Sequence, residues 1–219
     1  MHSQWSRGIT AILLVGWAAG MATAQDSAAA SRQRLPLLSI KDIQYVGAFR
    51  VPARKFGPSD LNFSQGPIAL RPDGKSLFIV GHAHQQAIAE FTIPELVDST
   101  VLAELNMAGD PVQPFAMILD RASGGNPESN NKIGGMLCVA GPNGPELLVN
   151  AYEYYDAPGD NRLSMLVVRD ANDLAKSAVD GYFEVQGRPG HTAGWMSPIP
   201  DPWQTVLGGR FLTGTSSGI

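Results

Sequence analysis

The sequence predicts an all-β protein. From Ile40 onward, apolar runs recur about every ten residues and are separated by glycine, proline, asparagine or aspartate, a spacing typical of a sandwich, barrel or propeller. Charged residues make up 16% of the 219 residues, below the roughly 25% of an average soluble domain. Glycine and proline number 24 and 16. Many turns and few long surface helices are therefore expected.

The first group of predicted strands lies between residues 45 and 93. Its stretch 71–75 contains Asp73-Gly74, which favours a tight hairpin because glycine tolerates the positive φ that such turns need. Proline cannot donate to a strand ladder, so Pro52 and Pro94 are expected to end strands. The predicted strands of this group are 45–51, 66–70, 76–81 and 87–93.

The second group repeats this order. Residues 147–150 follow residues 77–80 at an offset of 70, and in both groups a polar segment, a further strand and a short acidic connector come next. Recurrence of one strand-turn-strand unit predicts a repeat architecture. Strands are expected at 135–140, 146–152 and 163–169, with a turn at 141–144, and a third copy at 203–207 and 210–214.

Residues 68–93 carry the turn Pro72-Asp73-Gly74-Lys75, followed by a Leu-Phe-Ile-Val strand. This segment resembles blades of β-propeller proteins, which implies propeller-like blades of antiparallel strands around an axis. The chain offers two blades and the start of a third, and it stops just after an expected strand. We therefore expect an incomplete, truncated propeller whose repeat domain, residues 40–219, continues in a longer reading frame. The alternative is a complete, irregular β-sandwich.

Residues 1–24 have the pattern of a signal peptide. Arg7 precedes an apolar run, and Ala22-Thr23-Ala24 supplies the small residues that a signal peptidase reads. The alternative is a membrane anchor, but the uncharged run of about 14 residues is shorter than the ~20 that span a bilayer. We expect cleavage after Ala24, a flexible lead-in at residues 25–39, and a secreted or periplasmic protein with no membrane attachment after cleavage.

Charge and cysteine content narrow the function classes. The formal net charge of -4 gives no basic field for attracting nucleic acid, so no nucleic-acid partner is expected. Cys138 is the single cysteine and excludes an intrachain disulfide. Because it lies inside an apolar run, we expect it to pack as a small hydrophobic residue.

His82 and His84 directly follow a predicted strand. Residues two apart in an extended segment point to the same side, so the imidazoles can converge on one ligand. A metal would need a third ligand, which His191 or Glu90 would have to supply through the fold. The two histidines can act as a general acid or base, contact a ligand, or simply be polar loop residues, and these alternatives stay open. No metal or cofactor is expected.

Asn150, Tyr152 and Tyr154 occupy the matching position of the second group and share one predicted face. Aromatic planes that stack on sugar rings, together with amide and hydroxyl groups, suit carbohydrate recognition. The alternative is that tyrosine simply favours strands. Asp156, Asp160 and Asn161 do not match the spacing of a calcium loop.

These patterns predict an exported protein that binds or acts on an extracellular glycan. The alternatives are a non-catalytic ligand- or protein-binding module of the cell envelope and a purely structural component. Whether the protein is an enzyme, and in which oligomeric state it exists, stays open. The candidate catalytic residues are His82, His84, Tyr152 and Tyr154, and the candidate ligand-binding residues are Asn150, Arg162 as a charge for an acidic sugar, His191 and Trp195.

Overall fold

The computed structural model describes residues 38–185 and 193–214. The predicted signal peptide, most of the lead-in and His191 lie outside these residues. The chain divides into two compact units. Among the described residues, the smaller unit holds the 3-10 helix η1 (Ile40–Asp42) and helix α2 (Asp201–Leu207), and the larger unit holds every strand. No described helix has the length and apolar character needed to cross a membrane.

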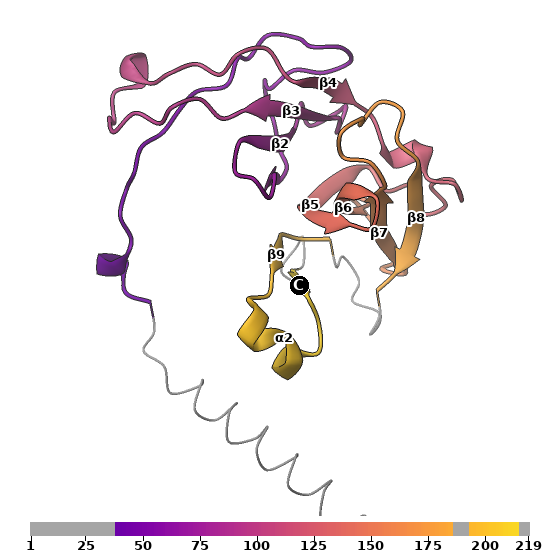
Figure 1. Ribbon diagram of the computed structural model, residues 1–219. Helices are drawn as coiled ribbons and strands as arrows, with labels where there is room; N and C mark the ends of the chain where they lie inside the picture. The colour runs from indigo at the N-terminus through magenta and orange to yellow at the C-terminus, as the bar shows by residue number, and fades with distance from the viewer. Residues whose placement is uncertain (1–37, 186–192, 215–219) are drawn as a thin grey trace, which may run out of the picture. The chain divides into compact units, whose positions relative to one another are not determined.

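The larger unit is built from three antiparallel sheets, drawn in Figure 1. The all-β prediction is therefore confirmed. In the first and second sheets each strand pairs with its neighbours in chain order. Sheet one contains β1 (Ile68–Leu70), β2 (Ser76–Val80), β3 (Ile88–Thr92) and β4 (Gln113–Ala116). Sheet two contains β5 (Lys132–Gly141), β6 (Gly144–Tyr152), β7 (Leu163–Val168) and β8 (Val179–Glu184). Sheet three contains β9 (Met196–Pro198) and β10 (Phe211–Thr213). Two further 3-10 helices are η2 (Leu102–Glu104) and η3 (Leu119–Arg121).

The two predicted hairpins are present. Gly74 has φ +70° and donates its N–H to the carbonyl oxygen of Arg71, which closes the turn between β1 and β2. Strands β5 and β6 pair over nine residue pairs and end at Gly141 opposite Gly144, so a two-residue turn joins them. The strands expected at 66–70, 76–81, 87–93, 135–140, 146–152 and 163–169 correspond to β1, β2, β3, β5, β6 and β7.

Two expected strands are wrong. Residues 45–51 form only two isolated bridges, Ala48 with Val97 and Arg50 with Met107. The first bridge is antiparallel and the second is parallel, so no single partner strand runs alongside this segment. Residues 203–207 lie in helix α2 rather than in a third copy. Proline in its first turn and Gly208 in the left-handed conformation after it are the start and stop signals of a helix.

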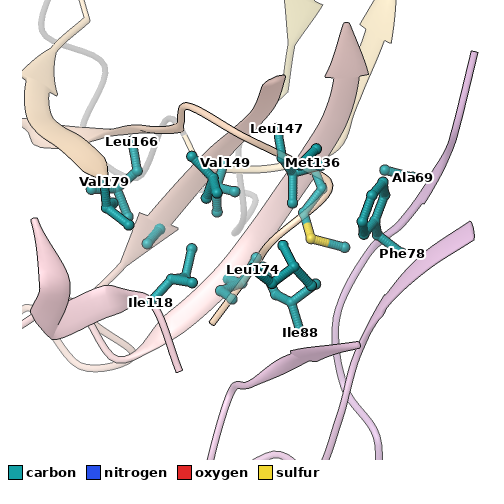
Figure 2. Packing of buried hydrophobic residues seen from close by; sticks show 14 of the residues in the cluster. Ala69, Phe78, Ile88, Ile118, Met136, Leu147, Val149, Leu166, Leu174 and Val179 are labelled. Carbon is teal, nitrogen blue, oxygen red and sulfur yellow. The ribbon is translucent and has the colours of Figure 1, made fainter. Parts of the chain in front are cut away.

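Sheets one and two contribute side chains to one shared apolar core. Figure 2 shows side chains of both sheets, with Phe78 and Ile88 from sheet one and Met136, Leu147 and Val149 from sheet two. Alternate residues of β6 point into this core, as the period of a strand requires. Each fully buried side chain of this size contributes about 1.5–3 kcal/mol relative to exposure. This packing fixes the end of β2 beside the start of β5.

A polar clamp also joins the two sheets. Glu90 on β3 accepts hydrogen bonds from Arg71 Nε at 2.8 Å and Nη2 at 3.0 Å, and from Ser76 and Gln113. Arg71 and Gln113 in turn donate to the carbonyl oxygen of Ala171, in the acidic connector after β7. Burial alone would raise the pKa of Glu90, but these hydrogen bonds, that of Arg71 foremost, lower it. The carboxylate is thus held charged at the sheet interface.

Sheet three packs against the first strand of sheet two. Strand β9 lies against β5, and the backbone next to it approaches two glycines of that strand. A Cβ at Gly134 would lie 1.3 Å from the carbonyl oxygen of Ala193, and one at Gly135 would lie 2.0 Å from that of Gly194. Only glycine permits this approach, which brings Trp195 beside β5.

Candidate functional site

The turn after β2 brings His82 and His84 together. Their ring centroids lie 5.1 Å apart, and the backbone N–H of His84 donates to His82 Nδ1 at 3.2 Å. A nitrogen that accepts a hydrogen bond carries no proton, so Nε2 of neutral His82 is an N–H donor. Phe63 contacts the His82 ring edge to face, with centroids 5.9 Å apart. His82 therefore presents a donor to any ligand.

Two side chains attach this histidine turn to sheet two. The buried amide of Gln86 accepts a hydrogen bond from Ile133 N at 2.8 Å and donates to Ala83 O at 3.0 Å. Lys132, the first residue of β5, donates from Nζ to Ala83 O at 2.7 Å. The turn is thus fixed against the strand that pairs with β6.

A hollow of about 620 Å³, here called the central hollow, opens at this junction. Lys132 Nζ lies 5.7 Å from the centroid of the Tyr154 ring, a cation-π distance. One ammonium and two imidazoles thus share a wall with a phenol, and none of the described lining residues is a carboxylate. The lining residues are Phe63, Gln65, His82, Ala83, His84, Lys132 and Tyr154.

A second space of about 270 Å³, the aromatic hollow, adjoins Tyr152, Tyr154 and Trp195. Trp195 is 57% exposed and Tyr154 is 72% exposed, so both rings present surface to solvent. Burial, and to a lesser degree the neighbouring Tyr154, raises the pKa of Tyr152, so its phenol keeps its proton at neutral pH. Gln65, Gly66, Lys132, Ile133, Gly134 and Gly194 complete the lining.

A third space of about 340 Å³, the amide hollow, lies on the other side of His84. Its wall is rich in amides, and Asn126 Nδ2 donates to Asp120 Oδ1 at 3.2 Å, which orients both groups. The other lining residues are Gln85, Gln86, Met117, Ile118, Leu119, Ser129, Asn130 and Asn131.

The structure places the sequence-predicted residues unequally. It brings His82, His84 and Tyr154 to the central hollow, and Tyr152 and Trp195 to the aromatic hollow. Arg162 is exposed and lines none of the three hollows; its backbone N–H donates to the Glu128 carboxylate at 2.8 Å. His191 lies outside the described residues.

Asn150 lies on the expected face of β6 but does not reach the rim, because sheet three covers it. It is fully buried, and its Nδ2 donates to Gly194 O at 3.0 Å and to Thr213 Oγ1 at 2.7 Å. Within residues 38–185 and 193–214 its Oδ1 has no hydrogen-bond partner. The Asn150 side chain thus attaches sheet three to β6.

Of the two side chains that would complete a metal site beside the histidines, Glu90 is engaged in the clamp between the sheets. The other, His191, lies outside the described residues. The described part of the chain contains no group of three or more His, Cys, Asp or Glu side chains able to hold a metal ion. Cys138 is buried in the core, and burial raises the pKa of its thiol to about 11. It packs as the small hydrophobic residue that the sequence predicts.

Comparison with known proteins adds no family assignment. No family model, no curated protein and no solved structure matches the chain.

Proposed function

We propose that this protein is exported and binds an extracellular glycan at the central hollow. The observation that carries the proposal is the shared wall of His82, His84, Lys132 and Tyr154. Sugars are recognised by aromatic faces that stack on the ring and by polar donors that fix its hydroxyl groups. This wall supplies both, and the neighbouring aromatic hollow adds further ring surface.

Export and a propeller-like architecture form part of the same proposal. The pattern of residues 1–24 supports passage through a secretion pathway. The identical strand order of sheets one and two, and the apolar core that they share, support two propeller-like blades. Sheet three, which packs against β5, would then be part of a further blade. Loops at one edge of such a stack commonly build a shared site.

Catalysis on the bound glycan is a second candidate, favoured by one observation. His82 Nδ1 accepts a hydrogen bond, so the neutral ring offers an N–H to the central hollow. The phenol of Tyr152 is also held protonated by its raised pKa. Both groups can therefore donate a hydrogen bond to a glycosidic oxygen, which would stabilise negative charge that develops there during bond cleavage. The non-catalytic binding module needs only the same contacts.

The binding proposal can be tested by affinity gel electrophoresis of the full chain with polygalacturonate, alginate, xylan and laminarin as probes. We expect at least one polysaccharide to retard the protein, and Tyr154→Ala to abolish the retardation. Tyr155→Ala is the matched control, because this equally exposed neighbour lines none of the three hollows. Absence of retardation by every probe, or equal loss in the two variants, would refute glycan binding at this site.

Catalysis is tested by release of reducing ends from the retarding polysaccharide. If the chain is an enzyme, Tyr152→Phe, which keeps the aromatic ring, abolishes turnover while retardation persists. Retardation without any release of reducing ends by the wild type assigns the protein to the non-catalytic class.

A further inference from the structure

The three hollows are not separate sites, because they share walls. Gln65, Lys132 and Tyr154 line both the central and the aromatic hollow. His84 lines both the central and the amide hollow. The central hollow therefore adjoins one flanking hollow at each of two sides, and the three spaces follow one another around the junction of sheets one and two.

The charge on these walls changes from one hollow to the next. Within residues 38–185 and 193–214, the lining of the central hollow includes an ammonium group and two imidazoles and no carboxylate, so it favours a negatively charged ligand group. The amide hollow has the Asp120 carboxylate among its amides, so it disfavours a second negative group. The aromatic hollow offers Tyr152, Tyr154 and Trp195, with Lys132 at its border.

The sizes suit a chain of sugar units better than one compact ligand. Sites for drug-sized ligands occupy about 300–1,000 Å³. The flanking hollows, at about 340 and 270 Å³, lie at or below the lower end of that range, and the central one, at about 620 Å³, lies within it. A linear molecule can place one unit in each.

We infer that the three hollows form one groove for a linear acidic oligosaccharide. An acidic unit lies in the central hollow against Lys132 and His82, a neutral unit lies in the amide hollow, and a ring stacks in the aromatic hollow. The inference rests on the proposed function and specifies its ligand class. It predicts a preference for chains in which acidic and neutral units alternate, since Asp120 repels a neighbouring acid.

Isothermal titration of the full chain with four probes tests this inference. The probes are glucuronate, a hyaluronan hexasaccharide with alternating acidic and neutral units, hexagalacturonate with acidic units only, and neutral cellohexaose. We expect the alternating hexasaccharide to bind at least about tenfold more tightly than glucuronate, which corresponds to about 1.4 kcal/mol. It should also bind more tightly than the other two hexasaccharides.

The outcomes separate the groove from the binding proposal itself. Equal affinity for glucuronate and the alternating hexasaccharide refutes the groove and leaves glycan binding intact. If cellohexaose binds as tightly as the alternating hexasaccharide, the central hollow does not select an acidic unit. If hexagalacturonate binds as tightly as the alternating hexasaccharide, the amide hollow does not select a neutral unit. If no probe binds and no polysaccharide retards the chain in gels, the proposed function fails together with the inference.

Single substitutions test the role of each hollow in oligosaccharide binding. Lys132→Met should remove the preference for acidic over neutral chains, and Lys132→Arg should retain it. The exposed Lys75→Met makes the same charge change away from the groove and should have no effect. Trp195→Ala and Gln85→Ala should each weaken hexasaccharide binding more than glucuronate binding. An equal loss for both ligands would overturn the assignment of these hollows as flanking subsites, and thermal melting confirms that each variant is folded.

Discussion

Gln86 accepts, at its side-chain oxygen, a 2.8 Å hydrogen bond from the backbone N–H of Ile133. The first residue ends the histidine turn of sheet one, and the second lies near the start of β5 in sheet two. This bond and the neighbouring bond from Lys132 to Ala83 set the position of the imidazoles relative to Tyr154. The geometry of the central hollow thus depends on contacts between sheets.

Replacing Gln86 should therefore cost both stability and binding. Gln86→Ala leaves the buried N–H of Ile133 without its acceptor, and we expect the free energy of unfolding to fall by about 2 kcal/mol. Urea denaturation measures this change, with Gln85→Ala as the stability control. A loss no larger than that of the control would show that the amide does not hold the turn.

The glycine at position 134 should be essential for the aromatic hollow. In Gly134→Ala the new Cβ collides with the carbonyl oxygen of Ala193, so the segment carrying Trp195 must move away from β5. We expect a blue or red shift of tryptophan fluorescence and a lower melting temperature. Gly109→Ala is the matched control, because a Cβ there meets nothing within 4 Å. Identical spectra and melting for the two variants would contradict the close approach.

Removing the charge of Glu90 should strongly destabilise the fold. Glu90→Gln leaves the guanidinium of Arg71 without its buried carboxylate, and breaking such a pair costs about 3–5 kcal/mol. The exposed pair of Arg169 with Asp180 is the control, since Asp180→Asn should cost less than about 1 kcal/mol. Similar unfolding midpoints for the two variants would show that the clamp is not a main link between the sheets.

The same carboxylate should make stability depend on pH in the acid range. Hydrogen bonds lower the pKa of Glu90 on folding despite its burial. The ionised Glu90 carboxylate therefore contributes fully to the free energy of unfolding when the pH is above the pKa of glutamate in the unfolded chain, about 4.3. The contribution is lost as the pH falls through the lower, folded value. Urea midpoints measured between pH 6 and 3 should therefore fall more steeply for the wild type than for Glu90→Gln. Parallel curves would exclude Glu90 as the source.

The sequence predicts strands well where they have a local signal. Strands β2 and β6 have long apolar runs, and the turns before β2 and β6 contain the glycines that tight hairpins need. Strands β4 and β8 were not predicted, since Pro114 and the pair Asp180-Gly181 interrupt their patterns. These strands are defined by pairing with β3 and β7, which no local pattern encodes.

The site is predicted in part for the same reason. His82, His84 and Tyr154 come from strand ends, which the alternation of residues locates. Lys132, Phe63, Gln65 and Gln86 were missed. A signal for Lys132 existed, because counting back from the turn at Gly141 and Gly144 places it near Tyr152, its observed partner. The contacts of Phe63 and Gln86 depend on packing between distant segments and have no such signal.

Strand β6 is an inner strand that pairs with both β5 and β7, its residues Leu147, Val149 and Ala151 lie in the apolar core, and Asn150 is buried against sheet three. Its amide protons can exchange with solvent only when these pairings open, so they should be among the last in the described residues to take up deuterium. Edge strand β1, with Ile68 and Leu70 exposed, should exchange early. Loosening can therefore begin at β1, beside the histidine turn, while β6 and the tyrosines at its end keep their place.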